Sequence, residues 1–340
     1  MSQNRLQIFL KRLVQREDLS RDEAKDLLEA LLDEEVTDAQ IAATLIALAT
    51  KGETIDELAG LASGLRSRAI PLNCCHRTFI DTAGTGSSSA KTFNISTAAA
   101  FVIAAAGLPV AKHGNRAASS KSGSADVLTA LGINVSALPA LSEAALNEIG
   151  ICFMFAPLYH GATARVAGIR RQLGVHTTFN LLGPLSNPAG APRQVVGVWA
   201  RELTDRLARV LTSLGTKRAW VVHGEDGLDE ITLTGKTFVA EAHEGTVRAF
   251  EIGPSDFGLD VASLEHLRGG DAEMNATIIQ DVFTGKRRDE AHSLIVMNAA
   301  AALVVGDVVS DLKTAARLAA RAIDEGDALK KLELLRVSTT

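Results

Sequence analysis

The sequence predicts an α/β fold in which a small all-helical domain accompanies a larger α/β domain with a central, mostly parallel sheet. Two observations lead to this prediction. Helix-start signals recur at equal intervals in the first 70 residues. After Pro71, short apolar segments alternate with helical ones, which is the pattern of parallel strands joined by crossover helices. A length of 340 residues is enough for two domains with buried cores.

Three capping boxes mark the helix starts of the N-terminal segment. In a capping box the N-cap hydroxyl accepts a hydrogen bond from the N3 amide, and the N3 side chain accepts one from the N-cap amide. The three pairs are Ser20 with Glu23, Thr37 with Gln40, and Thr54 with Glu57. An apolar helical period follows each box, and the equal spacing leaves room only for short turns. The segment therefore predicts antiparallel helices, and it carries no catalytic constellation.

The chain beyond Pro71 is expected to alternate strands and helices. The predicted order is a strand ending at Phe79–Asp81, a small-residue helix from Ser96, a strand over Leu108–Ala111, a helix over Ser124–Leu131 ended by Gly132, the short apolar segment Ile133–Val135, a strand over Val195–Val198, a helix over Leu203–Leu214 and a strand over Ala219–His223. Between the two halves, Arg170–Pro192 is rich in Gly, Pro and Asn and is predicted to be irregular. Ligands of such a sheet gather at the carboxyl ends of its strands.

Composition excludes several classes of protein. The chain has 35 Lys and Arg against 40 Asp and Glu, a formal net charge of −5, so it lacks the basic excess of a protein that grips nucleic-acid phosphates. Aromatic residues make up only 4%, which leaves few stacking platforms for single strands. A hydrophobic content of 46% argues against disorder.

Cysteine usage and hydropathy point to a soluble, cytoplasmic protein. The three cysteines are Cys74, Cys75 and Cys152, an odd number without metal-binding CxxC spacing, so free thiols in a reducing compartment are expected. The N-terminus leads into a charged amphipathic stretch and not into a signal-peptide apolar region. The longest apolar run, Ala98–Ala111, is shorter than the roughly 20 residues that span a bilayer.

The stretch from Asp81 to Thr97 carries the densest chemical signal. Its glycines allow main-chain amides to approach an anion closely, and Ser96 and Thr97 begin a helix whose free N–H groups favour phosphate. The alternative is an ordinary strand–turn–helix junction with serines at the cap. The stretch is neither a Walker loop nor a GxGxxG motif.

A second candidate anion loop follows the next strand. Lys112-His113-Gly114-Asn115-Arg116 and the serine-rich stretch from Ser119 to Ser124 place cations and small hydroxyl groups at a strand's carboxyl end. Lysine supplies charge there, while Asn, Ser and main-chain groups supply geometry. The alternative is a solvated surface loop. Two anion-suited loops on one βαβ unit favour a polyanion site.

These motifs resemble one family, the anthranilate phosphoribosyltransferases. The resemblance rests on Thr92–Thr97, the Lys112–Arg116 run with its serines, Phe155-Ala156-Pro157 with His160, Phe179–Leu185 with Asn187-Pro188, and Gly227-Leu228-Asp229-Glu230. They keep the family's order and spacing from the helical start to Leu335. Alone, the Asp229-Glu230 pair is more often a turn, and His160 more often a structural histidine.

The resemblance implies an enzyme that transfers 5-phosphoribose from phosphoribosyl pyrophosphate (PRPP) to the amine of anthranilate, in tryptophan biosynthesis. It implies no general base, with Lys112 as electrostatic stabiliser of the leaving pyrophosphate. The implied PRPP-binding residues are Gly84, Ser87, Ser88, Thr92, Asn94, Ile95, Ser96, Thr97, Lys112, His113, Gly114, Asn115, Arg116, Ser119, Ser120 and Ser124. The implied anthranilate-binding residues are Gly84, Asn115, Tyr159, His160 and Arg170.

The resemblance also implies metal, domains and assembly. Asp229 and Glu230 would hold Mg²⁺ on the pyrophosphate, with the Ser96 hydroxyl on a second ion. The helical domain would comprise residues 1–72 plus about 170–192, and the α/β domain residues 73–169 and 193–340, with the active site between them. A homodimer through the helical domain is expected.

Three positions depart from the family pattern, and two other functions remain as alternatives. Ser87-Ser88-Ser89 stands where the family has Gly-Asp-Gly, Gly168 where Pro is common, and His176 where Arg is usual. A pyrimidine-nucleoside phosphorylase of the same fold is one alternative, disfavoured by the intact Asn94–Thr97 and Lys112–Asn115. A non-catalytic nucleic-acid-binding paralogue is the other, and it predicts a basic surface and loss of Asp229-Glu230.

Overall fold

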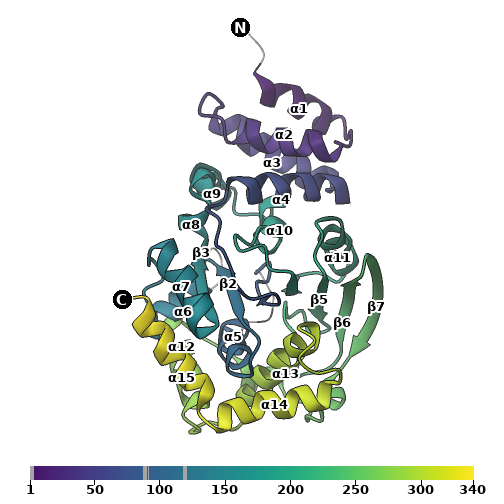
Figure 1. Ribbon diagram of the computed structural model, residues 1–340. Coiled ribbons are helices and arrows are strands. Elements are labelled where there is room, and N and C mark those ends of the chain that lie inside the picture. The colour runs from purple at the N-terminus through teal and green to yellow at the C-terminus, as the bar shows by residue number, and fades with distance from the viewer. Residues whose placement is uncertain (1–3, 87–89, 91, 118–120) are drawn as a thin grey trace.

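The computed structural model of the chain describes residues 4–86, 90, 92–117 and 121–340. Four residues expected to bind PRPP, namely Ser87, Ser88, Ser119 and Ser120, lie outside the described residues. The N-terminal helices form one end of an elongated molecule and a sheet flanked by helices forms the other (Figure 1). The predicted combination of a small helical domain and a larger α/β domain is confirmed.

The N-terminal helices begin where the capping boxes predict. Their bounds are α1 Arg5–Val14, α2 Arg21–Leu31, α3 Asp38–Lys51 and α4 Ile55–Arg68. The caps of α2, α3 and α4 each show both reciprocal hydrogen bonds of a capping box. Helix α1 starts on a cap that the sequence analysis missed, since the Asn4 side chain accepts from the Gln7 amide at 3.0 Å.

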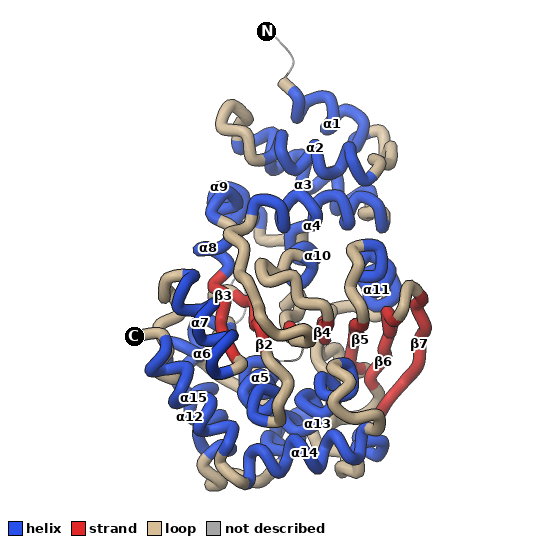
Figure 2. Tube along the Cα trace, in the orientation of Figure 1, coloured by secondary structure: helices blue, strands red, loops and turns tan. Residues whose placement is uncertain are grey.

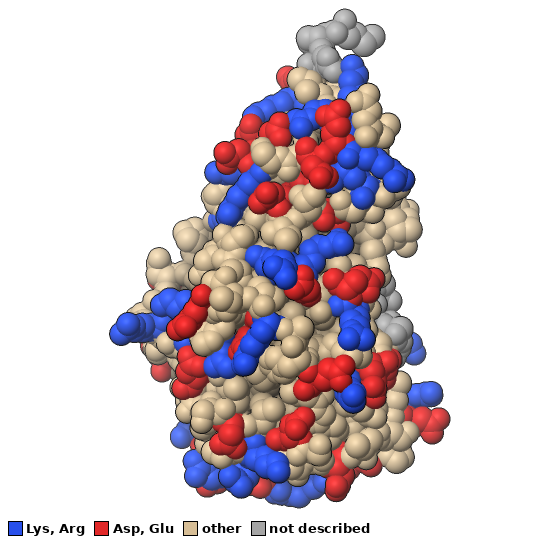
Figure 3. Space-filling model, turned by 90° about the vertical axis from the view of Figure 1, so that its right-hand side faces the viewer, with Lys and Arg blue, Asp and Glu red and all other residues tan. Residues whose placement is uncertain are grey.

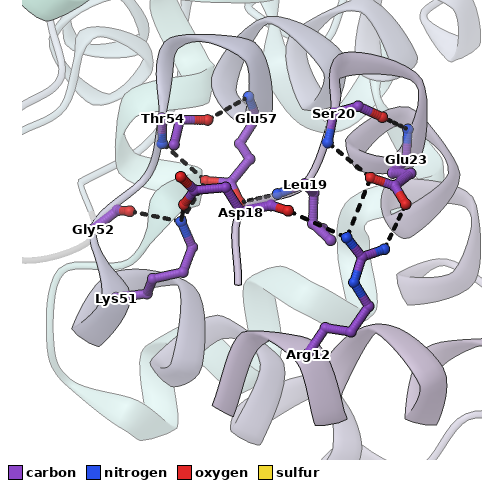
Figure 4. Close-up of polar contacts among 9 residues, drawn as sticks. All are labelled: Arg12, Asp18, Leu19, Ser20, Glu23, Lys51, Gly52, Thr54 and Glu57. Carbon is purple, nitrogen blue, oxygen red and sulfur yellow. Dashed lines mark hydrogen bonds and ion pairs between the residues drawn. The ribbon is translucent and has the colours of Figure 1, made fainter. Parts of the chain in front are cut away.

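The starts of α2 and α4 meet at a buried ion pair (Figure 4). Lys51 Nζ lies 2.9 Å from Oε2 of Glu57, and only 3% of the Lys51 side chain and none of the Glu57 side chain is exposed. Glu57 also accepts main-chain hydrogen bonds from Leu19 and Thr54, so one carboxylate ties together the starts of both helices. The capping glutamate of α4 therefore also organises the packing of the helical domain.

Within the described residues, seven strands form one sheet in the order β3-β2-β1-β4-β5-β6-β7. The strands are β1 Ile80–Asp81, β2 Val110–Gly114, β3 Ile151–Phe155, β4 Arg193–Gly197, β5 Arg218–Gly224, β6 Thr237–His243 and β7 Thr246–Ile252. The first five are parallel to one another, while β6 and β7 form an antiparallel hairpin at one edge (Figure 2). The prediction of a mostly parallel sheet is confirmed.

Alternating side chains of the strands pack into two separate cores. On β4 and β5, Val195, Trp220 and Val222 face the core shared with the C-terminal helices. Val196 and Val221 face the opposite core, which includes the N-terminal helices. The helices of the α/β part are α5 Ile95–Ala105, α6 Ser124–Ala130, α7 Pro139–Ile149, α8 Ala156–Tyr159, α9 Ala164–Leu173, α10 Thr178–Leu185, α11 Leu203–Ser213, α12 Ala272–Phe283, α13 Glu290–Val305, α14 Leu312–Asp324 and α15 Asp327–Ser338.

The segment Arg170–Pro192 is not irregular, as the sequence suggested, because it contains the end of α9 and the whole of α10. Helix α10 begins with a capping box of Thr177 and Asn180. Apolar residues of both helices share the core of the N-terminal bundle, and α10 contacts α3 and α4. The assignment of this segment to a discontinuous helical domain stays a prediction.

One predicted strand has other bounds in the structure, and one apolar segment of the sequence forms no strand. Strand β2 extends through Lys112 and His113 to Gly114, because all five of its residues pair with β3. Lys112 and His113 therefore lie inside the sheet and not in a loop. The apolar segment Ile133–Val135 forms a turn that leads to α7, since its side chains pack into the core without a strand partner among the described residues.

The described residues contain no helix long and apolar enough to cross a membrane. Acidic and basic side chains are interspersed over the face shown in Figure 3, without a broad region of one sign. This distribution agrees with the balanced charge of the sequence and gives no sign of a nucleic-acid interface on that face.

Candidate active site at the switch point of the sheet

The sheet has a topological switch point between β1 and β4. From β1 the chain proceeds outward through β2 to β3, and it then returns to the other side of β1 to form β4 and β5. Ligands of open parallel sheets bind outside the carboxyl ends of the strands at such a point. The loop from Thr82, the end of β2, the loop after β4 and the loop after β5 meet there, and these segments carry most of the predicted site residues.

The loops after β1 and β4 touch through their main chains. Thr85 N donates to the Gly197 carbonyl at 2.8 Å, and the Thr85 hydroxyl donates to the same oxygen at 3.1 Å. A Cβ on Gly84 would stand 3.3 Å from that oxygen, so Gly84 fits closely against Gly197. The predicted glycine-rich turn is therefore held against β4, and Gly84 is exposed beside it.

The carboxylates of the β5 loop face the start of α5. Glu230 Oε1 accepts from the Ser96 amide at 3.2 Å, so this carboxylate occupies the N-terminus of the helix that the sequence assigned to phosphate. Burial and the neighbouring charge of Asp229 raise the pKa of Glu230 to about 7, against a smaller opposing effect of Lys112. The structure thus brings Ser96 and Glu230 into contact, with Asp229 next to Glu230 in the same loop, and their roles as metal ligands stay a prediction.

Lys112 is a buried ammonium group aimed at the same place. Its Nζ lies 3.1 Å from the Thr82 carbonyl oxygen, 3.2 Å from the Thr82 hydroxyl and 3.4 Å from Ser96 Oγ, and the residue is 4% exposed. Burial lowers the pKa of Lys112, and the charges of Asp81 and Glu230 partly offset the effect. Its three hydrogen-bond partners are neutral hydroxyl and carbonyl oxygens, while the carboxylates of Asp81 and Glu230 act on the ammonium through their charge.

Two further residues, which the sequence analysis did not assign to the site, hold this strand in place. Asp81 Oδ1 accepts from the His113 amide at 3.1 Å, and Asp81 Oδ2 accepts from Asn187 Nδ2 at 2.7 Å. Asn187 also donates to the Ala111 carbonyl at 2.9 Å. Burial raises the pKa of Asp81 to about 6, although the nearby Lys112 charge lowers it. The sequence did contain a signal for Asp81, since an acidic residue at the end of an apolar strand is unusual unless it has a role there.

Asn94 joins three segments of the chain. Its side chain bonds with Ser122 and with Asn275 of α12, which is 2% exposed. Asn275 was also missed by the sequence analysis, because a single asparagine so distant along the chain carries no local signal. Thr92 pairs with Arg268 in an isolated β-bridge, so the segment before α12 lies directly against the segment before α5.

The loop after β2 folds back on itself. Ser124 Oγ donates to the Asn115 carbonyl at 3.2 Å, and a Cβ on Gly114 would overlap Ser124 Oγ. Arg116 pairs with Asp126 at 3.0 Å and lies over the Phe155 ring, 5.7 Å from its centroid. Asn115 and Arg116 are exposed after the end of β2, and Gly114 permits the close turn.

Two histidines predicted to bind substrate lie together. The His113 and His160 ring centroids are 5.2 Å apart, and His113 Nδ1 lies 3.3 Å from the Gly183 carbonyl of α10. Burial lowers the pKa of His113 to about 3 and also lowers that of His160, where the Ser186 main chain partly offsets the effect. Both imidazoles are therefore neutral near pH 7, and neutral rings are suited to contact an uncharged aryl amine.

Arg170 of α9 is a partly buried cation. Its guanidinium lies over the Phe179 ring, 5.8 Å from the centroid, and its buried Nε has no hydrogen-bond partner. In the described part of the chain, no carboxylate forms an ion pair with it. Burial lowers the pKa of Arg170, which measures the cost of holding this charge without a counter-ion. An anionic ligand would satisfy it.

Three further residues predicted to contact substrate are buried in the structure. Tyr159 is only 1% exposed and packs into the core of the α/β part, where burial raises the pKa of its phenol to about 12. Ile95 is buried and its amide donates to the Phe93 carbonyl at 2.8 Å. Thr97 is buried in the first turn of α5. The burial of Tyr159 therefore argues against direct contact between its phenol and a substrate.

The donor chemistry of the β5 loop fits Mg²⁺. The described residues include no group of three or more His, Cys, Asp and Glu side chains that could hold a metal on its own. Mg²⁺ in phosphate sites characteristically uses one or two carboxylates, waters and substrate oxygens. Asp229, Glu230 and the Ser96 hydroxyl supply hard oxygen ligands of this type. Burial first, and then the neighbouring Asp229 charge, raise the pKa of Glu230, and a bound cation would stabilise its carboxylate form.

Comparisons with known proteins agree with this arrangement. Residues 7–69 match the helical bundle domain of a glycosyl transferase family, and residues 76–329 match the a/b domain of a glycosyl transferase family. An anthranilate phosphoribosyltransferase of Desulfosudis oleivorans is 48% identical to this chain over 326 residues, which is 96% of both chains.

Two solved structures are similar over nearly the whole chain. The anthranilate phosphoribosyltransferase of Thermus thermophilus aligns with a TM-score of 0.92 and 39% identity, covering 97% of this chain and 98% of that one. The enzyme from Saccharomyces cerevisiae in complex with PRPP and Mg aligns with a TM-score of 0.90 and 27% identity, covering 99% and 98%. The similarity therefore extends over both the helical part and the α/β part of the chain.

Proposed function

The chain belongs to the anthranilate phosphoribosyltransferase family, and we propose that it performs the family's reaction with the residues gathered at the switch point of its sheet. This reaction joins the 5-phosphoribosyl group of PRPP to the anthranilate amine and releases pyrophosphate. The observation that carries the assignment of the site is the buried Lys112 ammonium, which faces Ser96 and the Asp229-Glu230 loop.

The leaving pyrophosphate lies, in this proposal, against Lys112 and the start of α5. The bond from the ribose anomeric carbon to the pyrophosphate oxygen breaks, and positive charge develops on the ribose. The Lys112 ammonium stabilises the departing anion, because Thr82 and Ser96 fix it in place before the reaction begins. Bound there, Mg²⁺ would supply Lewis-acid neutralisation of the pyrophosphate charge, with Asp229 and Glu230 holding one ion and the Ser96 hydroxyl a second.

The anthranilate carboxylate pairs with Arg170 in this proposal. A guanidinium can hold a carboxylate through two parallel hydrogen bonds, and Arg170 has no acidic partner in the described residues to displace. Neutral His113 and His160, together with exposed Gly84 and Asn115, would line the path of the ring toward the ribose.

The amine attacks the anomeric carbon in its neutral form. An aryl amine is unprotonated near pH 7, so no strong base is needed to generate the nucleophile, and the proton lost from nitrogen passes to water. Catalysis is then mainly positioning of two substrates and stabilisation of the leaving group. This accounts for a site rich in glycine, serine and lysine with no nucleophile–base pair.

A nucleoside phosphorylase remains the second enzymatic candidate in principle, but Arg170 favours anthranilate. A phosphorylase would bind inorganic phosphate and a nucleoside. Neither carries a carboxylate group for the Arg170 guanidinium beside Phe179 to bind. The retained Asp229-Glu230 pair and the mixed surface charge disfavour a nucleic-acid-binding paralogue.

A homodimer, two Mg²⁺ ions per subunit and a cytoplasmic location are part of the same proposal. Helices α1 and α3 expose the apolar side chains of Ile8, Val14 and Ile46, which are 51%, 69% and 37% accessible. Such residues on a helical surface suit contact with a second copy. Cys74, Cys75 and Cys152 are free thiols, in keeping with a reducing compartment.

The test is direct. With MgCl₂ and PRPP, the purified protein is expected to consume anthranilate, which is measured as a loss of anthranilate fluorescence. One pyrophosphate should be released for each anthranilate consumed. No decay at saturating substrates would refute the proposed activity. Phosphorolysis of a pyrimidine nucleoside by the same preparation would favour the second candidate instead.

A further inference from the structure

We propose that Asn275, in the first turn of α12, is a positioning residue for PRPP. It fixes the side-chain amide of Asn94 so that an Asn94 N–H points toward an oxygen of the substrate. The inference deepens the proposed function and rests on it, because it takes PRPP to bind at the start of α5.

Asn94 occupies a helix cap without acting as one. It stands at the N-cap of α5, where asparagine ordinarily accepts a hydrogen bond from the helix's own amides, but its side chain makes no such bond. Instead Oδ1 accepts from Asn275 Nδ2 at 3.0 Å and from Ser122 Oγ at 3.1 Å. Nδ2 donates to the Ser122 carbonyl at 3.2 Å. The side chain is therefore held from outside the helix.

Main-chain groups at both ends define the direction of this hydrogen-bond chain. The Gly270 amide can only donate, and it does so to Asn275 Oδ1 at 2.8 Å. Nδ2 of Asn275 must then be the atom that faces Asn94, which receives it at Oδ1. At the other end the Ser122 carbonyl can only accept, so Asn94 Nδ2 lies on that side. The orientation of both amides thus follows from fixed partners and not from an arbitrary assignment.

The segment just before α12, the helix that carries Asn275, packs directly against the segment before α5. Thr92 and Arg268 form an antiparallel bridge, and a Cβ on Gly269 would stand 2.5 Å from Phe93 N. Asn275 is 2% exposed, and α12 packs against α6, which follows the Ser122 loop. Asn275 therefore has little freedom to move, and its bond to Asn94 is a rigid connection between α12 and the start of α5.

One donor remains on Asn94. Its Nδ2 carries two hydrogens, of which Ser122 receives one, and no acceptor elsewhere in the described residues is bonded to the second. Asn94 is half-buried and sits beside Ser96 at the helix start that faces the Asp229-Glu230 loop. A phosphate or ribose oxygen can take that hydrogen. If the amide were reversed, its oxygen would face the substrate's oxygens and repel them.

Asn275→Asp tests the inference because it keeps shape and reverses one polarity. A carboxylate can still accept from Gly270, but at pH 8 it cannot donate to Asn94. We expect the KM for PRPP to rise about tenfold, the effect of misdirecting one substrate hydrogen bond, while kcat and the KM for anthranilate change less than threefold. The matched control is Gln280→Glu, the same amide-to-acid change at an exposed position of α12, with less than a twofold effect on all three.

A double-mutant cycle removes the contribution of the added charge. In an Asn94→Ala background, Asn275→Asp should change the KM for PRPP less than twofold, because its target is gone. An unchanged KM in the single variant, or the same tenfold rise in both backgrounds, would overturn the inference. Asn275→Ala run through the same cycle replaces the aspartate variant if that one does not fold.

Calorimetric titration with PRPP and MgCl₂ separates the two levels of the proposal. If the wild-type protein binds PRPP but does not consume anthranilate, the proposed function fails while the role of Asn275 is still measured by the loss of PRPP affinity. If anthranilate is consumed and Asn275→Asp binds PRPP as the wild type does, the role of Asn275 fails and the function stands.

Discussion

A Cβ atom on Gly197 would overlap the main-chain carbonyl oxygen of Asp229. The end of β4 is therefore packed directly against the loop that carries the two carboxylates of the site. The same glycine accepts both hydrogen bonds of Thr85 through its carbonyl oxygen. Gly197 thus sets the distance between the glycine-rich loop after β1 and the carboxylate loop after β5.

Gly197→Ala is expected to lower kcat/KM for PRPP about 10- to 100-fold. The added methyl group must push the Asp229 main chain away, and displacements of about 1 Å in a positioned site cost roughly this factor. Steady-state kinetics with varied PRPP and Mg²⁺ would measure it. Gly253→Ala is the control, because a Cβ there meets its nearest atom at an ordinary 3.7 Å. Equal kinetics of the two variants would show that the Asp229 loop adapts freely.

Arg170→Ala is expected to raise the KM for anthranilate about 10- to 100-fold with little change in the KM for PRPP. A charge-assisted hydrogen bond to a carboxylate contributes about 1.5–3 kcal/mol, which corresponds to that range. Arg171→Ala, on the exposed neighbouring residue, should leave both constants unchanged. An unaltered anthranilate dependence in Arg170→Ala would refute the carboxylate contact.

Local patterns made most of the fold predictable. The capping boxes of Ser20, Thr37 and Thr54 involve residues three apart, so the sequence contains the whole interaction. Helix α10 escaped because its box uses Asn180 at N3, and Gly183 and Pro184 suggested a loop. The β6–β7 hairpin was not predicted, although alternating apolar residues on both sides of Glu244-Gly245 were a usable signal.

Contacts between distant segments set the limit for the site. Lys112 and His113 contradict the apolar pattern of a central strand, so β2 seemed to end at Ala111, although they are buried there because the site requires them. Asn187, Gly197 and Asn275 act through residues far away in the chain. No spacing rule connects such pairs, and only the packed structure brings them together.

The apparent affinity for Mg²⁺ is expected to weaken as pH falls below about 7. The raised pKa of Glu230, about 7 in the metal-free protein, means that this ligand takes up a proton there, and each further unit of pH then costs up to tenfold in affinity. Titrations of Mg²⁺ in the presence of PRPP between pH 5.5 and 8.5 would show it. Glu230→Gln should bind Mg²⁺ weakly with a shallower pH profile, whose remaining slope comes from the PRPP phosphates, since a phosphate group has a second pKa of about 6.

The raised pKa of Glu230 also affects the stability of the metal-free protein, and this effect changes with pH in the direction opposite to that of the Mg²⁺ affinity. Because its folded pKa lies above the unfolded value, the folded protein binds the extra proton between pH 4.5 and about 7, and stability without Mg²⁺ falls as pH rises through that window. Glu230→Gln should therefore raise Tm at pH 8 in EDTA and raise it less at pH 5. A larger gain at pH 5 than at pH 8 would contradict the burial of an ionisable group at this position.

Lys51→Met is expected to destabilise the helical domain by about 3 kcal/mol. The substitution leaves the fully buried carboxylate of Glu57 without its cation, and breaking one side of a buried ion pair typically costs 3–5 kcal/mol. The hydrogen bonds from Leu19 and Thr54 to Glu57 remain, which places the value at the lower end. Denaturant unfolding would measure it, with Lys11→Met on exposed α1 as the control. Adding Glu57→Gln to Lys51→Met should recover part of the loss, since the charge that lacks a partner is then removed; a further loss of stability would mean that Glu57 acts mainly through its main-chain hydrogen bonds.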